Sequence, residues 1–169
     1  MKIREAHIND APAISKVTVD TWKTAYRGII SDEYLNNLSY EEREKGWREF
    51  PFHNSFIYVA ENETQNIIGF AAAGPERTSN PVYSGELYAI YIYKDQQNKG
   101  IGSSLIRSVM KRFEQLGIYS VLVWVLSESP YRRFYERNGG YKIDSKLLEM
   151  DGFKSEVTAY GWLDIRAKF

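Results

Sequence analysis

The stretch "IYIYKDQQNKGIGSSLI", residues 90–106, constrains the fold most because its hydrophobic period changes within a few residues. It begins with the alternation of a strand and ends with the i, i+4 spacing of a helix. Gly100 and Gly102 lie between the two patterns, so no side chain covers the backbone near the expected helix start. The first amides of a helix lack intrahelical partners and favour anions. The stretch predicts a strand–turn–helix unit that could hold an anionic group.

Two known phosphate-binding motifs do not match the sequence of this turn. A Walker loop requires G-x-x-x-x-G-K-[ST], which does not occur in the chain. A dinucleotide fingerprint requires a third glycine three residues after the second, and Leu105 stands there. A bare Gly-x-Gly also fits an ordinary connection in which glycines allow close packing, so the short motif alone leaves both interpretations open.

Composition excludes several other classes of protein. A chain of 169 residues fits one domain, residues 1–169, and 22 basic against 22 acidic residues give no net charge to attract nucleic acid or an anionic membrane. The absence of cysteine excludes disulfides, zinc–thiolate sites and an acyl-cysteine intermediate. The two histidines have no metal-ligand spacing, so we expect no metal site. Without a signal-like N-terminus or a membrane-length apolar run, we expect a cytoplasmic protein.

Periodicity along the rest of the chain predicts an α/β fold of the α+β type, a mixed sheet with helices on both faces. The segment 31–50 is expected to form a surface helix or helix pair, and an i, i+4 stripe predicts a helix over 101–116 that Gly117 ends. A hairpin is expected around Asp151-Gly152. Strands are predicted at 2–7, 56–62, 66–74, 86–93, 120–126, 140–150 and 155–163, and further helices at about 11–25 and 131–140.

The longer pattern around the turn carries a family resemblance. Gln97 to Gly102, behind the strand at 86–93 and ahead of the helix at 101–116, resembles the Q/R-x-x-G-x-G/A motif of the GNAT superfamily of N-acetyltransferases. The resemblance extends over the whole element order. It implies the GNAT fold, with a mixed, mostly antiparallel sheet of six to seven strands, and an acyltransferase that uses acetyl-coenzyme A.

The same resemblance implies a set of cofactor contacts. The loop amides would hold the pyrophosphate, residues 90–92 would pair with the pantetheine, and the amide of Ile92 would polarise the acetyl carbonyl. Arg132, on a helix with other basic residues, fits either a 3′-phosphate or a solvated surface. The implied cofactor-binding residues are Ile90, Tyr91, Ile92, Gln97, Asn98, Lys99, Gly100, Ile101, Gly102, Ser103, Ser129 and Arg132.

Transfer to an amine needs a base because a lysine-like amine, with a pKa of about 10.4, is almost entirely protonated at neutral pH. Glu86 is the candidate, since it lies fourteen residues before Gly100, the distance at which family members with a strand glutamate carry their base. It could act directly or through water. The alternative is an exposed charge at a strand end.

The leaving thiolate needs a proton, and Tyr135 is the candidate donor. It lies in "YRRFYERNGGY", which resembles the family's F-Y-x-x-x-G pattern, with Gly139 as the glycine. The alternative is a tyrosine that only packs under the cofactor. Seven residues earlier the family often has Asn, whereas this chain has Glu128, followed by Ser129 and Pro130. Either Ser129 or Glu128 could cap the helix, with Pro130 in its first turn.

The acceptor is expected to be a small amine, a polyamine or a protein amino group, bound by the first helices and later loops. Trp22 and Tyr26, with Tyr88, Tyr91 and Trp124, could line an aromatic cleft or could simply form core. Acidic residues between 32 and 44 could attract a polyamine or be a solvated face. A homodimer is left open. The rival hypothesis is a non-catalytic acyl-coenzyme A sensor.

Overall fold

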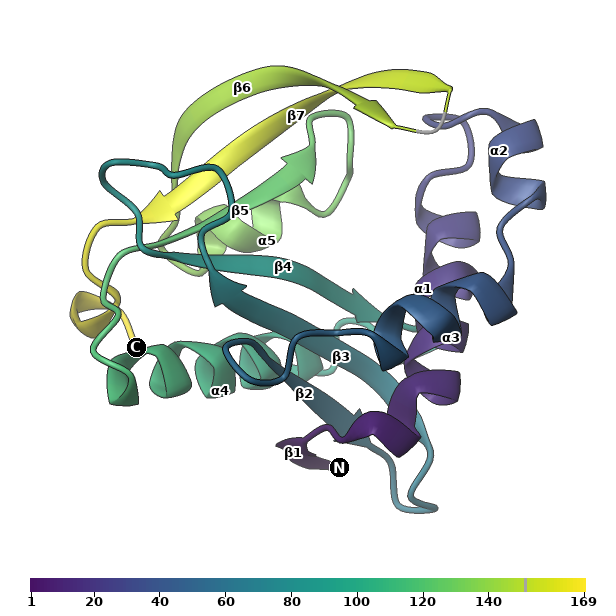
Figure 1. Ribbon diagram of the computed structural model, residues 1–169, viewed down its shortest axis with the longest axis horizontal. Helices are drawn as coiled ribbons and strands as arrows, with labels where there is room; N and C mark the ends of the chain where they lie inside the picture. The colour runs from purple at the N-terminus through teal and green to yellow at the C-terminus, as the bar shows by residue number, and fades with distance from the viewer. Residues whose placement is uncertain (151) are drawn as a thin grey trace.

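A computed structural model describes residues 1–150 and 152–169 and arranges them around one seven-stranded sheet in the order β1-β2-β3-β4-β5-β7-β6 (Figure 1). Only β4 and β5 pair in parallel, so the predicted mixed, mostly antiparallel sheet is confirmed. The strands are β1 (Lys2–Glu5), β2 (Phe56–Glu61), β3 (Ile67–Pro75), β4 (Gly85–Ile92), β5 (Val121–Leu126), β6 (Tyr141–Met150) and β7 (Phe153–Trp162). The helices are α1 (Ala11–Ala25), α2 (Asp32–Asn36), α3 (Tyr40–Arg48), α4 (Ile101–Gln115) and α5 (Arg132–Arg137), with 3₁₀ turns at Ile8–Asp10, Lys94–Gln96 and Ile165–Ala167.

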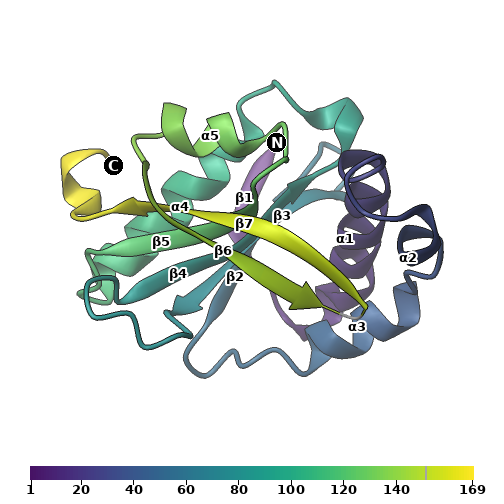
Figure 2. The same ribbon diagram turned by 90° about the horizontal axis from the view of Figure 1, so that it is seen from above.

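The helix α4 covers one face of the sheet, and α1 to α3 lie at the other (Figures 1 and 2). The predicted apolar stripe of α4 is confirmed, since Leu105, Val109 and Phe113 are fully buried against β2 to β4. Leu116 is the exception at 48% exposed, because α4 ends at Gln115 and Leu116 turns out into solvent before Gly117.

The segment 31–50 forms the predicted helix pair. Each helix begins at a serine whose hydroxyl accepts a hydrogen bond from a backbone amide in the first turn: Ser31 from Tyr34 and Ser39 from Glu42. The chain must break between these caps, so α2 and α3 can turn separately onto α1.

A β-bulge in β4 sets which side chains face α1. Ala72 of β3 pairs with Ala89 and Ala73 pairs with Leu87, so Tyr88 is an extra residue on β4. Before the bulge, Leu87 faces α4; after it, Ile90 and Ile92 do. The intervening side chains, including that of Tyr91, therefore face α1.

The last two strands form a long antiparallel hairpin that crosses toward α2 and α3 (Figure 2). Phe153, at the start of β7, meets Tyr34 of α2 edge-on at 4.8 Å between ring centroids. Gly152 has a φ of 89°, which suits glycine in a turn. Asp151, the other residue of the predicted turn, lies outside the described residues.

Candidate functional site

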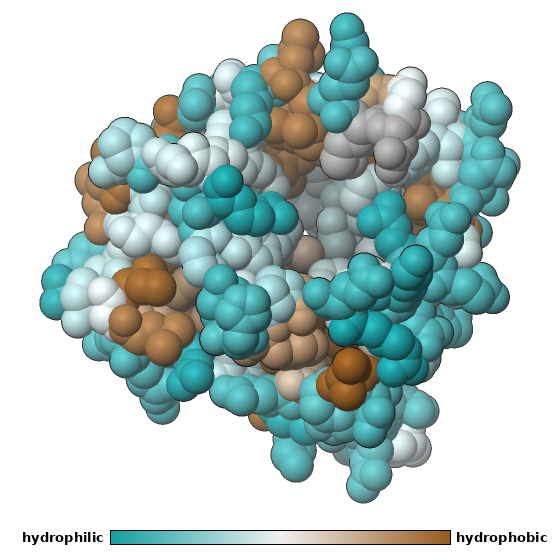
Figure 3. All heavy atoms as spheres, in the orientation of Figure 1, coloured by the Kyte–Doolittle hydropathy of each residue, from teal (hydrophilic) through white to brown (hydrophobic). Residues whose placement is uncertain are grey.

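The sheet opens where β4 and β5 separate. The two strands pair only from Gly85 to Leu87 against Val121 to Val123, and both then continue without pairing to each other. The amide of Tyr93 donates to Ile68 of β3, so by alternation the peptide groups of Ile92 and Ile90 face the opening. Figure 3 shows a hollow at this place, with a pale floor and a largely hydrophilic rim.

The glycine turn lies at the end of the same strand. The side chain of Gln97 donates to the carbonyl of Ile92 (Nε2–O 3.0 Å), which ties the turn to β4. Asn98 and Gly100 take positive φ values of 61° and 81°, so the backbone turns sharply into α4. The amide of Ser104 donates to Gly100, which leaves the amides of residues 101–103 without intrahelical partners. The turn can therefore offer several N–H groups to an anion.

Gly102 has a packing role as well. A Cβ at this position would lie 3.0 Å from the ring of Phe134, so the start of α4 packs closely on α5. At Gly100, by contrast, a Cβ would have no heavy atom within 4 Å, and the space above that residue is open. The two glycines serve different needs, close packing and an unobstructed turn.

Tyr135 of α5 is buried beneath the opening. Its ring stacks on Tyr160 at 6.1 Å and meets Phe134 edge-on at 5.3 Å. Burial raises the pKa of the Tyr135 hydroxyl, and the nearby Tyr91 adds to the rise. The hydroxyl is therefore protonated throughout the physiological range and can donate a hydrogen bond.

Ser129 and Arg132 lie together at the end of β5. The Ser129 hydroxyl accepts from the amide of Tyr131 (3.2 Å), and Arg132 donates to the carbonyl of Ser127 (Nη1–O 2.7 Å). Both residues line a second cavity near Glu128. The predicted place of Pro130 in the first turn is wrong, because α5 begins at Arg132, two residues later.

Glu86 lies before the bulge and is only 2% exposed, which rules out an exposed charge at a strand end. Its carboxylate accepts from the Arg77 guanidinium (Oε2–Nη2 2.7 Å) and from the Arg77 amide (3.2 Å). Arg77 also lies over the ring of Tyr88, at 4.1 Å from the centroid. Gly85 and Leu87 face α4, so Glu86 faces the α1 side, as Tyr91 does. The sequence did not reveal Arg77 as its partner.

Aromatic side chains fill the space between α1, α2 and the open ends of β4 and β5. Trp22 and Tyr26 meet edge-on at 5.0 Å, and Tyr91 and Trp124 pack against the same cluster, as predicted. Tyr88 does not join them, since it packs with the neighbouring cluster and donates to the carbonyl of Pro75. The sequence missed Tyr34 and Phe153, although an aromatic residue next to a turn glycine was a usable signal for the latter.

A cavity of about 820 Å³ adjoins this cluster, between α2, α3 and the start of β7. Of the acidic residues between 32 and 44, all of which the structure describes, only Glu33 and Glu42 line it, and both are exposed. Asp32 pairs with Arg27 and Glu44 with Arg48 on the outer surface. Most of the acidic run is thus a solvated face. Arg43, which the sequence did not single out, also lines the cavity.

Within the described residues, no helix is both long and apolar enough to cross a membrane.

The chain resembles known proteins in sequence and in structure. A sequence model of the acetyltransferase (GNAT) family matches residues 22–141. Identity to the "uncharacterized N-acetyltransferase YuaI" of Bacillus subtilis (strain 168) is 35% over 165 residues, 98% of this chain and 94% of that protein. Identity to the spermidine N(1)-acetyltransferase of Thermoplasma acidophilum is 25% over 150 residues, 85% of this chain and 89% of that protein.

Among solved structures, the PaiA N-acetyltransferase from Thermoplasma acidophilum in complex with coenzyme A has the same fold. The TM-score is 0.69 at 22% identity, over 93% of this chain and 96% of that one.

Proposed function

Because the chain belongs to the acetyltransferase (GNAT) family and is an N-acetyltransferase, we propose that it transfers an acetyl group from acetyl-coenzyme A directly to a primary amine bound beside it. The observation that carries this proposal is the separation of β4 from β5 next to the open turn before α4. The spermidine acetyltransferase relative and the coenzyme A-bound structural neighbour agree with an amine acceptor and this cofactor.

The residues at the opening fit such a cofactor. The peptide groups of Ile90 and Ile92 face the gap and supply strand-like hydrogen bonds for a pantetheine amide. The turn from Gln97 to Ser103 supplies amides for a pyrophosphate, with Gly100 leaving the backbone accessible. Lys99, which reaches Gln96 at 3.4 Å, and Ser129 and Arg132, which line a cavity at the end of β5, are proposed as further contacts.

Acetyl-coenzyme A would supply a thioester, whose carbonyl carbon accepts the amine and whose sulfur leaves. Glu86 removes the proton from the acceptor ammonium, directly or through water, so that the nitrogen becomes nucleophilic. The amide of Ile92 donates to the carbonyl oxygen as negative charge develops there.

Tyr135 donates a hydrogen bond to the leaving sulfur. A thiol has a pKa of about 8.5, and burial raises that of Tyr135 above the usual tyrosine value of about 10, so complete proton transfer between them is uphill. Tyr135 therefore stabilises the sulfur mainly by a shared proton. The second proton of the acceptor nitrogen passes to the departing thiolate as the amide forms, so the sulfur leaves as a thiol.

Calorimetric titration with acetyl-coenzyme A, followed by a thiol-release assay with a panel of amines, tests this function. We expect one saturable site and amine-dependent release of the thiol. Gln97→Ala should weaken binding about twofold to tenfold through loss of one hydrogen bond. Gln115→Ala, at the opposite end of α4, is the control and should bind normally. Binding without release for any amine would favour the non-catalytic sensor, and no binding would refute the proposal.

A further inference from the structure

Arg43 lines the cavity between α2, α3 and the start of β7, where we place the acceptor. Its guanidinium lies 5.3 Å from the ring centroid of Trp22, which is 8% exposed, and Arg43 itself is half-buried. Burial raises the pKa of the Tyr91 hydroxyl, and the positive charge of Arg43 partly offsets that rise, so the two groups interact. Among the described residues, Arg43 takes part in no ion pair. This contrasts with Arg48, which pairs with Glu44 one turn along.

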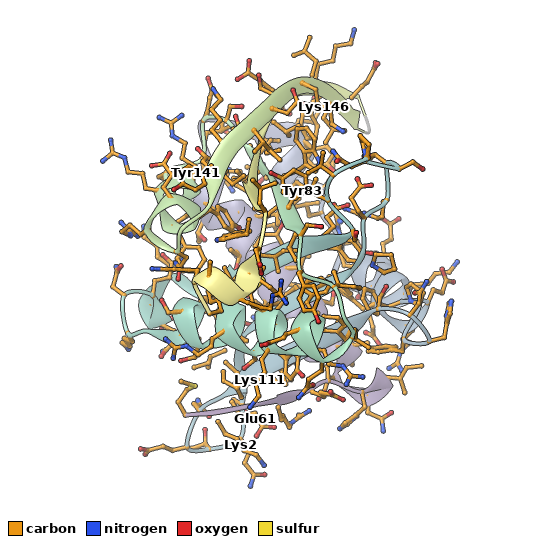
Figure 4. All side chains as sticks on the ribbon, turned by 90° about the vertical axis from the view of Figure 1, so that its left-hand side faces the viewer. Lys2, Glu61, Tyr83, Lys111, Tyr141 and Lys146 are labelled. Carbon is orange, nitrogen blue, oxygen red and sulfur yellow. The ribbon has the colours of Figure 1, made fainter. Side chains whose placement is uncertain are left out.

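A second cation covers the other tryptophan of the cluster. Lys146 of β6, labelled in Figure 4, lies 4.1 Å from the ring centroid of Trp124. The rings of both tryptophans thus already carry a cation from the chain itself. A substrate ammonium would compete for these rings and meet two like charges, which argues against a polycationic acceptor. Glu33 and Glu42, the acidic lining residues within the described part of the chain, are exposed, and their charges are screened by solvent.

The indole N–H groups of the same two tryptophans have no well-aligned hydrogen-bond acceptor among the described residues. The indole nitrogens of Trp22 and Trp124 are buried, and neither makes a hydrogen bond of good geometry within the described residues; Trp22 lies close enough to the Tyr91 hydroxyl to lower its pKa but is not aligned with it. Buried N–H groups without a partner are rare because losing water is costly unless another acceptor replaces it. Both donors occur in one cluster, and a cation lies over each of the two rings. An anionic oxygen would supply both a hydrogen-bond acceptor for the donors and a negative charge for the cations.

We propose that the acceptor carries a carboxylate on the same small molecule as its amine, as a free amino acid does, and that Arg43 binds this carboxylate. The indole N–H of Trp22 supplies a second hydrogen bond, and Lys146, which lies over the ring of Trp124, adds positive charge to the same aromatic cluster. A guanidinium suits the task because its N–H groups match the two oxygens of a carboxylate. The inference rests on the proposed function and narrows its substrate class.

Matched pairs of amines test the inference in the thiol-release assay. L-Phenylalanine would be compared with phenethylamine and L-phenylalaninamide, and L-leucine with isoamylamine; β-alanine and 4-aminobutyrate vary the distance between the two groups, and spermidine represents polycations. We expect the best carboxylate-bearing amine to exceed its counterpart without a carboxylate about tenfold to a hundredfold in kcat/KM, as for a hydrogen bond to a charged group.

Variants of Arg43 then locate the effect. Arg43→Gln should remove that preference, mainly by raising KM for the amino acid, and should leave acetyl-coenzyme A affinity unchanged; kcat/KM for the amine without a carboxylate should change far less than that for the amino acid. Arg43→Lys should restore part of the preference, because the charge remains without the bidentate geometry. Arg48→Gln is the control, since it removes an arginine of the same helix that does not line the cavity.

The outcomes separate the inference from the function on which it rests. Acetylation of amines without a carboxylate or of spermidine, with no preference for carboxylates and no effect of Arg43→Gln, would overturn the inference and leave the function standing. If acetyl-coenzyme A binds but no amine reacts, tryptophan fluorescence would follow titration of the same amino acids into the coenzyme A complex. A saturable change lost in Arg43→Gln supports the inference; no change with any carboxylate overturns it.

Discussion

The two faces of the sheet differ in how completely their aromatic and apolar side chains are buried and hydrogen-bonded. On the α4 face, Leu105, Val109 and Phe113 are fully buried, and Trp162, beneath α5, donates its indole N–H to the carbonyl of Asn138. On the α1 face, Tyr91 and Trp124 are half-buried, and the indole nitrogens of Trp22 and Trp124 lack partners. The contrast teaches that the α1 face combines a fully buried core around Ile14 and Phe70 with an open end, where both tryptophan indoles lack well-aligned partners and a cavity adjoins them.

Phe113→Ala should produce the largest change in stability and test the α4 face. The side chain is fully buried and meets Phe56 at 5.2 Å, so its loss leaves a cavity and should lower the free energy of unfolding by about 3–5 kcal/mol. Chemical denaturation measures the change. Acetyl-coenzyme A affinity of the folded variant should stay near normal; a large loss of affinity would show that the faces are not independent.

Glu86→Gln should produce the largest change in turnover. We expect a fall of about a hundredfold or more at neutral pH, because the acceptor ammonium must then lose its proton unaided. The deficit should shrink as pH rises toward about 10, where the amine deprotonates by itself. Initial rates across this range give the profile, with Glu44→Gln on the solvated face of α3 as the control. A loss that is the same at every pH would contradict the base role.

A pair of tryptophan substitutions compares the faces directly. Trp162→Phe breaks a buried hydrogen bond of 2.9 Å and strands the carbonyl of Asn138, whereas Trp22→Phe removes a donor that has no partner. Both shorten the ring equally, so we expect Trp162→Phe to be more destabilising by about 1–2 kcal/mol. Parallel denaturation curves measure the difference. Equal losses would mean that the Trp22 nitrogen is satisfied, for example by water.

Tyr135→Phe should have the smallest effect of the series. Loss of one shared proton at the leaving sulfur should lower turnover about tenfold, with acetyl-coenzyme A affinity nearly unchanged. Since burial raises the Tyr135 pKa, the hydroxyl stays protonated as pH rises, and the wild-type rate should show no loss from its ionisation up to about pH 10. Calorimetry and initial rates separate the two effects. An equal loss of affinity would assign Tyr135 to packing.

Local sequence patterns were enough to predict the buried face of α4 and the glycine turn that precedes it. The stripe of α4 depends on one helix period, and the turn from Gln97 to Gly102 depends on a short run of adjacent residues. Both are properties of neighbours along the chain, so the sequence displays them. The order of helices and strands along the chain could be predicted for the same reason, since each element has its own period.

The acceptor side could not be predicted to the same depth. Arg43 lies in a helix whose residues are nearly all polar, and only the packing of α3 onto Trp22 distinguishes it from Arg48. Likewise, Arg77 is nine residues from Glu86 across a loop, and no periodicity links them. These partners are set by how distant elements dock, which one sequence without its fold does not reveal.

The extra residue at Tyr88 shifts by one residue the alternation of β4 side chains between the two faces of the sheet. Without it, a simple alternation would place Glu86 and Tyr91, five residues apart, on opposite faces of the sheet. With it, both face α1, while the apolar side chains on either side of the bulge keep facing α4. A deletion of one residue here would therefore move either the carboxylate or the open half of the strand to the wrong face, however conservative the remaining sequence. In this strand the count of residues matters as much as their identity.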